Sequence, residues 1–148
     1  MNTYEINEDT LALIPKGEND VMIYEKDDSF LCSSNCTEIM DNSCKYYGST
    51  YEGRKEGSKY ILGASYKLPI IVEESKFLIF IPTESPYLPS CVWLSLNHIV
   101  KIEKNLQNTI VTFSNNKQIK LPISYRSLEN QILRATRLES LLRKRQNY

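Results

Sequence analysis

The pattern of apolar and polar positions near the N-terminus predicts short strands followed by a helix. Residues 10–15 and 21–25 form two expected strands joined by a turn-rich Lys-Gly-Glu-Asn-Asp segment, and residues 29–32 extend the same sheet. From Asn35 the apolar spacing becomes helical, and Gly48 provides a natural stop. This third of the chain therefore predicts a small sheet and one short internal helix.

The middle of the chain is predicted to be rich in strands. The glycine-containing residues 48–57 are expected to form a loop or a broken helix, and residues 83–90, with two prolines, an exposed loop. Residues 93–102 alternate between apolar and polar side chains, which is typical of one strand with His98 and Val100 on its apolar face. Other apolar runs predict strands at residues 60–62, 69–72, 77–81, 110–113 and 118–121. The last two flank Ser-Asn-Asn-Lys, a sequence suited to a hairpin turn.

A long amphipathic helix is predicted from about Ser127, with Ser124 or Ser127 as its cap. The fold class expected is therefore α+β, with mostly antiparallel strands, one short internal helix and a C-terminal helix. We expect a single domain over residues 1–148. Its parts are acidic N-terminal strands at 1–34, a helix with a basic Gly/Tyr loop at 35–60, a β-rich part at 61–123 and the C-terminal helix at 124–148.

The charges are unevenly distributed along the chain although the net charge is zero. Residues 1–40 hold two cations and nine carboxylates, a net charge of −7, whereas residues 41–148 hold sixteen cations and nine carboxylates, a net charge of +7. A molecule polarised in this way can direct its basic part at DNA. The alternative is that the charges scatter over the folded surface, because position in the chain is not position on the surface.

Composition favours a cytoplasmic protein with no membrane partner. No apolar run approaches the roughly twenty residues that span a bilayer, and the N-terminus lacks the features of a secretory signal. The four cysteines are then expected to be free thiols. They form no paired metal-binding motif, and one histidine is too few to complete a zinc site, so we expect neither a metal nor another cofactor.

Residues for catalysis are scarce, and no enzymatic activity is expected. His98 shares its predicted face with leucines and valine, which favours a hydrogen-bonded structural histidine over a general base. The run Gly48-x-x-x-x-Gly53-Arg54-Lys55 only approaches a phosphate-binding loop, because arginine replaces the lysine and lysine replaces the hydroxyl residue. A spatial pair of Cys91 and His98 is the one enzymatic alternative.

Residues 41–60 carry the most informative chemistry, because they interleave four cations with four tyrosines and three glycines. Cations pair with phosphates, hydroxyl groups donate hydrogen bonds to them, and glycines let a backbone approach closely. This mixture is typical of a nucleic-acid surface. The alternative is a tyrosine-bearing helix followed by a solvated turn.

The chain resembles the bacterial competence transcription factors, the ComK family, in several blocks from about residue 35 to residue 137. They are Cys-Lys-Tyr-Tyr-Gly-Ser (44–49) with Tyr-Glu-Gly-Arg-Lys-Glu-Gly (51–57), Lys-Leu-Pro-Ile-Ile-Val (67–72), Cys-Val-Trp-Leu-Ser (91–95) with His98, Val-Thr-Phe-Ser-Asn (111–115), and Leu-Pro-Ile-Ser-Tyr-Arg-Ser-Leu-Glu-Asn-Gln (121–131). The first forty residues resemble the family only loosely. The chain stops at Tyr148, where longer members continue, so the resemblance is to a short member without the C-terminal tail.

The resemblance implies a transcription activator of competence genes that binds A/T-rich double-stranded DNA as an oligomer, in the minor groove. It also implies RNA polymerase and a proteolysis adaptor as partners. Physical chemistry supports binding in the minor groove. A-tracts narrow this groove and deepen its negative potential, which attracts arginine and lysine side chains. No helix-turn-helix pattern is apparent, which favours a loop or hairpin that enters the groove. We expect contacts to DNA from Lys45, Tyr46, Tyr47, Ser49, Tyr51, Arg54, Lys55, Lys59, Arg126 and Arg137.

The expected C-terminal helix supports a second hypothesis, a protein-interaction module that pairs with a full-length regulator and modulates it. Arg126, Arg137 and Lys144 fall on the side opposite the apolar stripe, together with Leu133 and Leu141. A purely solvated face has no need of these leucines, so the mixture favours a protein contact such as self-association.

Overall fold

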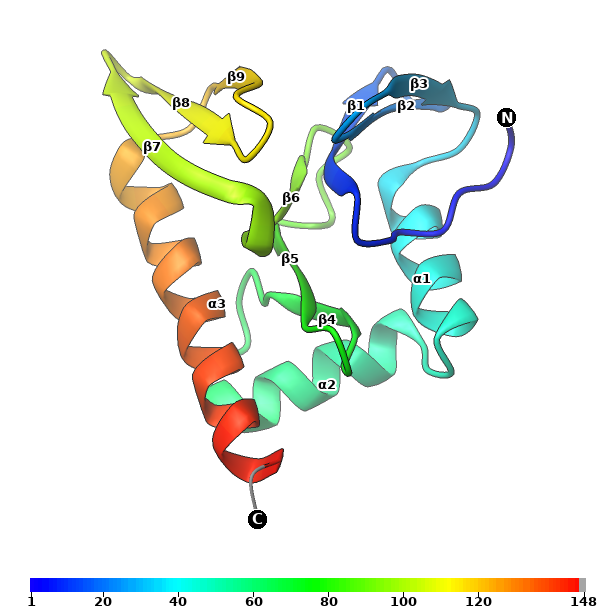
Figure 1. Cartoon of the computed structure of the whole chain (residues 1–148), viewed down its shortest axis with the longest axis vertical. Coiled ribbons are helices and arrows are strands. Elements are labelled where there is room, and N and C mark those ends of the chain that lie inside the picture. Colours follow the sequence, from blue (N-terminus) through cyan, green and yellow to red (C-terminus); the bar gives the residue numbers. More distant parts are fainter. Residues whose placement is uncertain (147–148) are drawn as a thin grey trace.

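The computed structural model describes residues 1–146, which fold into helices and antiparallel strands (Figure 1). The α+β class predicted from the sequence is confirmed. In order, the elements are β1 (Thr10–Lys16), β2 (Asp20–Glu25), β3 (Ser29–Cys32), α1 (Cys36–Tyr46), α2 (Tyr51–Leu62), β4 (Ile70–Glu73), β5 (Leu78–Pro82), β6 (Trp93–Ser95), the 3₁₀ turn η1 (Leu96–His98), β7 (Ile99–Asn105), β8 (Asn108–Phe113), β9 (Gln118–Leu121) and α3 (Tyr125–Gln146).

The larger sheet joins the N-terminal strands to those from the middle of the chain. Its described strands run in the order β3-β2-β1-β6-β5-β4, and every neighbouring pair is antiparallel. The central pairing places Leu13 of β1 opposite Trp93 of β6. The acidic strands at 1–34 are therefore built into the same sheet as the family-like block that contains Trp93.

The centre of this sheet is buried on both faces, where successive side chains of a strand enter two different cores. Along β5, Ile79 and Ile81 enter a core shared with α3, whereas Leu78 and Phe80 enter a second core that includes residues of α1. All residues of β5 are buried. Burial on both faces explains why residues 77–81 read as a continuous apolar run rather than an alternating one.

The smaller sheet, β7-β8-β9, lies beside α3 and shares the first core. Val111, Phe113 and Leu121 of this sheet are buried with Leu128 and Leu138 of α3. The predicted hairpin between β8 and β9 is confirmed, and Asn116 in its turn has a φ of 70°. An asparagine tolerates this left-handed conformation better than a β-branched or bulky residue.

Residues 48–57, expected to form a loop or a broken helix, contain the break between two helices. Residues 51–62 form the helix α2, so the described residues hold two internal helices rather than the one expected. Thr50 caps this helix by accepting a hydrogen bond from the Gly53 backbone N–H at 2.9 Å, and Gly63 ends it at a φ of 65°. Capping and burial of Ser58 and Leu62 offset the low helix propensity of the two glycines. The strand predicted at 60–62 is the last turn of this helix.

The single strand predicted over residues 93–102 is also wrong. The 3₁₀ turn η1 divides it, so that β6 belongs to the larger sheet and β7 to the smaller one. Val100, expected on the apolar face, is 64% exposed. Local alternation cannot reveal that a chain leaves one sheet and enters another, because the two halves have the same period.

Candidate nucleic-acid interface

The corner between α1 and α2 is shaped by local hydrogen bonds. Gly48 follows α1 with a φ of 92°, which favours glycine, and Thr50 caps α2. Asp41 of α1 joins the helices, because its Oδ1 accepts a hydrogen bond from the Tyr51 backbone N–H at 3.0 Å and its Oδ2 lies 3.0 Å from Nζ of Lys45. The Tyr51 N–H and then Lys45 stabilise the carboxylate and lower the pKa of Asp41.

Some predicted contact residues are available to a partner. Lys45 and Lys59 are exposed, and Tyr46 is 67% exposed with its ring edge-on to Tyr47 at a centroid distance of 5.0 Å. Ser49 lies half-buried in the turn between the helices. Lys45, Tyr46 and Ser49 lie at the corner, whereas Lys59 lies in the last turn of α2.

Two of the predicted tyrosines instead hold the fold together. The hydroxyl of Tyr47 donates a hydrogen bond to the Ile6 carbonyl at 2.8 Å, which fixes the N-terminal segment against α1. Tyr51 packs edge-on against Trp93 with ring centroids 6.2 Å apart, and burial raises its pKa to about 12. Sequence spacing alone did not separate these structural tyrosines from the exposed Tyr46.

Arg54 and Lys55 are less free than a loop position would leave them. The Arg54 side chain is only 20% exposed, with its guanidinium 3.9 Å from a carboxylate oxygen of Glu74. Lys55 lies 3.2 Å from the Glu52 carboxylate one turn away. Both cations lie on the helix α2, so they are not carried by a glycine-rich loop that could insert them into a DNA groove.

Arg126 and Arg137 are exposed on α3, a helix that runs along the side of the molecule away from α1 (Figure 1). They lie eleven positions apart in the sequence, which corresponds to about 16 Å of helix. They do not form one patch with Lys45 and Tyr46. Arg134, by contrast, turns inward: its guanidinium donates to the Lys67 carbonyl at 3.2 Å and to Gln131, and burial lowers its pKa.

A groove that sequence analysis missed lies beside α2. It has a volume of about 320 Å³, and the 65–68 segment and the turn at Ser85, Pro86 and Tyr87 line it with Tyr51, Lys55 and Lys59 of α2. Tyr66 and Tyr87 are exposed at its edge. Two signals pointed to them: the mixture of cations and tyrosines continues past residue 60, and Tyr87 lies in a turn between two prolines.

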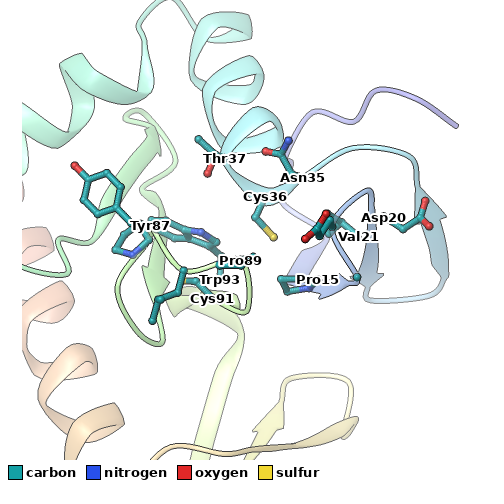
Figure 2. A pocket seen from close by; sticks show the side chains of 14 residues that line it. Pro15, Asp20, Val21, Asn35, Cys36, Thr37, Tyr87, Pro89, Cys91 and Trp93 are labelled. Atoms are coloured by element: carbon teal, nitrogen blue, oxygen red, sulfur yellow. The ribbon is translucent and has the colours of Figure 1, made fainter.

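A second hollow of about 330 Å³ lies on the other side of the same turn, between the start of α1 and the β1–β2 hairpin (Figure 2). Figure 2 shows the Tyr87 ring directed away from Cys36. Burial raises the pKa of Cys36 to about 12, with a contribution from Cys91, and burial also raises the pKa of Cys91 to about 11. These protonated thiols are poor nucleophiles.

The spatial pair of Cys91 and His98 has no support, because each residue has other partners. The Cys91 thiol donates to the Glu84 carbonyl at 3.5 Å. The His98 ring bonds to the Ser114 hydroxyl through Nδ1 and to the Glu8 carbonyl through Nε2, as expected for a structural histidine. All four cysteines are free thiols, as predicted, and within residues 1–146 no cluster of His, Cys, Asp or Glu is suited to a metal ion.

Two oppositely charged parts of the sequence are separated in space. The strands β1–β3, with their connecting turns, lie at one side of the molecule and α3 lies at the other (Figure 1). Exposed carboxylates at Glu18, Asp27 and Asp28 belong to the first region, and exposed cations at Arg126 and Arg137 to the second. No helix of the described residues is long and apolar enough to cross a membrane.

Comparison with known proteins agrees with the sequence resemblance. The family model described as ComK protein matches residues 1–147. The competence transcription factor of Bacillus subtilis (strain 168) is 38% identical over 144 residues, which cover 95% of this chain and 75% of that protein. No solved structure gives a significant match. The chain belongs to the ComK family and is a ComK-type transcription regulator.

Proposed function

We propose that the protein binds double-stranded DNA at competence promoters and activates transcription, with the α1–α2 corner and the outer side of α2 as its contact surface. The observation that carries this proposal is the 38% identity to a competence transcription factor over 95% of the chain. Exposed Lys45 and Lys59 supply charge for phosphates, and exposed Tyr46 supplies a ring and a hydroxyl group.

The proposed targets are A/T-rich boxes. Their narrow minor groove carries an enhanced negative potential, which attracts lysine and arginine side chains. Since Arg54 and Lys55 lie on a helix, an approach by the helical corner replaces insertion of a loop. The family resemblance still favours the minor groove, and the choice of groove has a direct test.

Titration of an A/T-box duplex and a scrambled duplex of equal composition, at about 50 and 200 mM salt, tests the function. We expect tighter binding to the box and a steep loss of affinity with salt, because phosphate contacts release counterions. Equal affinity for both duplexes would contradict sequence-specific recognition.

Two lysine variants locate the surface. We expect Lys59→Ala to weaken binding and to lower the salt slope by about one unit, because one phosphate contact is lost. Lys16→Ala is the matched control, since Lys16 is also exposed but lies on the acidic N-terminal strand β1. If both variants weaken DNA binding equally, α2 is not the contact surface.

Replacement of A·T pairs by inosine·cytosine pairs distinguishes the two grooves. Such a pair presents the acceptors of A·T in the minor groove but those of G·C in the major groove, because inosine lacks only the guanine amino group. Binding that survives the replacement supports the minor groove. Binding that is lost places α2 in the major groove instead.

The α3 surface supports a second role, association with another copy or with a longer regulator. Leu133 is 59% exposed, between cations at Arg126 and Arg137. Leu133 and the cations on either side of it form a mixed apolar and basic surface that a protein partner can cover. RNA polymerase, the proteolysis adaptor, a cytoplasmic location and the absence of catalysis stay predictions of the resemblance and the composition.

A further inference from the structure

The groove beside α2 has the size and walls of a small-ligand site. Its volume of about 320 Å³ is at the lower end of the range for such sites, roughly 300–1,000 Å³. A small molecule, or a small unit of a longer chain, fits this volume.

Aromatic rings dominate the edge of this groove. Tyr66 is 66% exposed and Tyr87 is 88% exposed, although tyrosine rings of this size normally bury much of their surface. Tyr51 lies deeper, where it contacts Trp93. Exposed rings around a hollow favour a planar ligand, because stacking on an aromatic face is sequence-tolerant and favourable for every nucleobase.

The charges along the groove fit one phosphate group. Three lysines line it, and Lys55 is paired with Glu52, whereas Lys67 places its Nζ 5.3 Å from the Tyr66 ring centroid. Glu56 also lines the groove and opposes a highly charged anion. The balance of three cations and two carboxylates suits a monophosphate or phosphodiester better than a triphosphate.

The wall that carries Tyr66 and Lys67 is held in an unusual conformation. Lys67 has a φ of 47°, in the left-handed region that non-glycine residues rarely adopt. Its carbonyl accepts hydrogen bonds from Gln131 at 2.9 Å and from Arg134 at 3.2 Å, both on α3. Strained backbone that neighbouring groups hold in place is typical of binding sites.

We propose that this groove binds one nucleotide, with the base against Tyr66 and Tyr87 and the phosphate near Lys59. The nucleotide comes either from a DNA strand or from the free pool, and the chemistry is the same in both cases. The inference rests on the proposed DNA binding only for the first source.

Calorimetric titration with three probes tests the chemistry without any duplex: deoxyadenosine monophosphate, deoxyadenosine and deoxyribose 5-phosphate. We expect the nucleotide to bind about tenfold tighter than either fragment, because only the nucleotide combines stacking with a phosphate contact. In an amide NMR spectrum of the protein, the resonances that shift on addition of the nucleotide should include those of Tyr66 and Tyr87. Absence of binding at millimolar nucleotide, or equal binding of the sugar phosphate, would overturn the inference.

Paired variants test the residues. Tyr87→Ala and Lys59→Ala should each weaken nucleotide binding about tenfold. The matched controls are Tyr60→Ala, 83% exposed on α2 but not lining the groove, and Lys16→Ala, and both should bind as the unchanged protein does. If the control variants weaken nucleotide binding as much as Tyr87→Ala and Lys59→Ala do, the proposed site is wrong.

Addition of the A/T-box duplex to the nucleotide complex identifies the source. Displacement of the nucleotide supports a groove that holds a unit of the DNA strand, and retention supports a site for a free nucleotide. A protein that binds the nucleotide but no duplex keeps this inference and contradicts the proposed function. A protein that binds the duplex but not the nucleotide contradicts this inference and keeps the proposed function.

Discussion

At the scale of single residues, exposure separates binding from support within the predicted interface. Lys59 is exposed on α2, whereas the Arg54 side chain, about 1.4 turns earlier on the same helix, is 20% exposed and faces Glu74. Both are cations in the same family-like segment. Their different surroundings predict different consequences of mutation.

We expect Arg54→Ala to lower the free energy of unfolding by about 1 kcal/mol, because it removes packing between α2 and Glu74. This corresponds to a fall in Tm of about 2–4 °C for a chain of this size. Thermal melts followed by circular dichroism measure it, with Lys59→Ala as the control that leaves Tm unchanged. An Arg54→Ala protein with unchanged Tm and weaker DNA binding would restore Arg54 to the interface.

At the scale of secondary-structure elements, Asp41 makes the α1–α2 corner sensitive to pH. Its pKa is lower in the folded protein than in the unfolded chain, where it is about 3.9. Its contribution to stability is therefore complete above that value and is lost as the pH falls through the folded pKa. The relevant window begins near pH 4 and extends below it.

Comparison with Asp41→Asn isolates this contribution from that of other carboxylates. Asparagine accepts the Tyr51 N–H bond but neither titrates nor pairs with Lys45. We expect the variant to have the lower urea midpoint at pH 7 and the difference to shrink at pH 3. A difference that stays constant between the two pH values would show that Asp41 does not couple the corner to pH.

The two glycines inside α2 provide a second test at this scale. An alanine Cβ at Gly57 would meet nothing within 4 Å, so Gly57→Ala should stabilise the protein by about 0.5–1 kcal/mol. At Gly53 the Cβ would lie 3.1 Å from Oγ1 of the capping Thr50, which offsets the gain. Urea unfolding should rank Gly57→Ala above the unchanged protein and Gly53→Ala below Gly57→Ala.

The stabilised Gly57→Ala variant also tests how closely DNA approaches α2. If the phosphate backbone contacts this side of the helix, the added methyl group should weaken DNA binding while the unfolding midpoint rises. Unchanged DNA affinity in the stabilised variant would mean that DNA does not contact α2 at Gly57.

At the scale of the whole molecule, the acidic strands and the basic α3 lie on different sides (Figure 1). Leu133 lies at the centre of the outward face of α3, and Leu141 is half-buried nearer its end. A contact through this face in a two-fold dimer would present two α1–α2 corners to one duplex.

We expect Leu133→Glu with Leu141→Glu to give a folded monomer with weaker DNA binding, because bivalency is lost. Sedimentation at tens of micromolar protein, with and without duplex, measures the oligomeric state. Leu106→Glu is the matched control, since Leu106 is 87% exposed at the tip of the β7–β8 hairpin. If the protein without substitutions is already monomeric, both with and without duplex, a dimer through α3 is contradicted.

Features encoded over a few neighbouring residues could be predicted from the sequence. The strands at residues 10–15 and 21–25, the Asn35 start of α1 and the Ser124 cap of α3 were all confirmed. Each depends on a local pattern, either a run of strand-forming residues or a capping side chain.

Features that depend on contacts between distant segments could not be predicted in this way. The helix α2 forms despite its glycines because a face that includes Ser58 and Leu62 packs against the rest of the molecule, and tertiary packing outweighs intrinsic propensity. The groove joins the segments of Tyr66 and Tyr87, 21 residues apart, which no local pattern brings together. Residue type thus marked α2 as a basic surface, whereas only folding sorted its cations into those that face solvent and those that hold the helices in place.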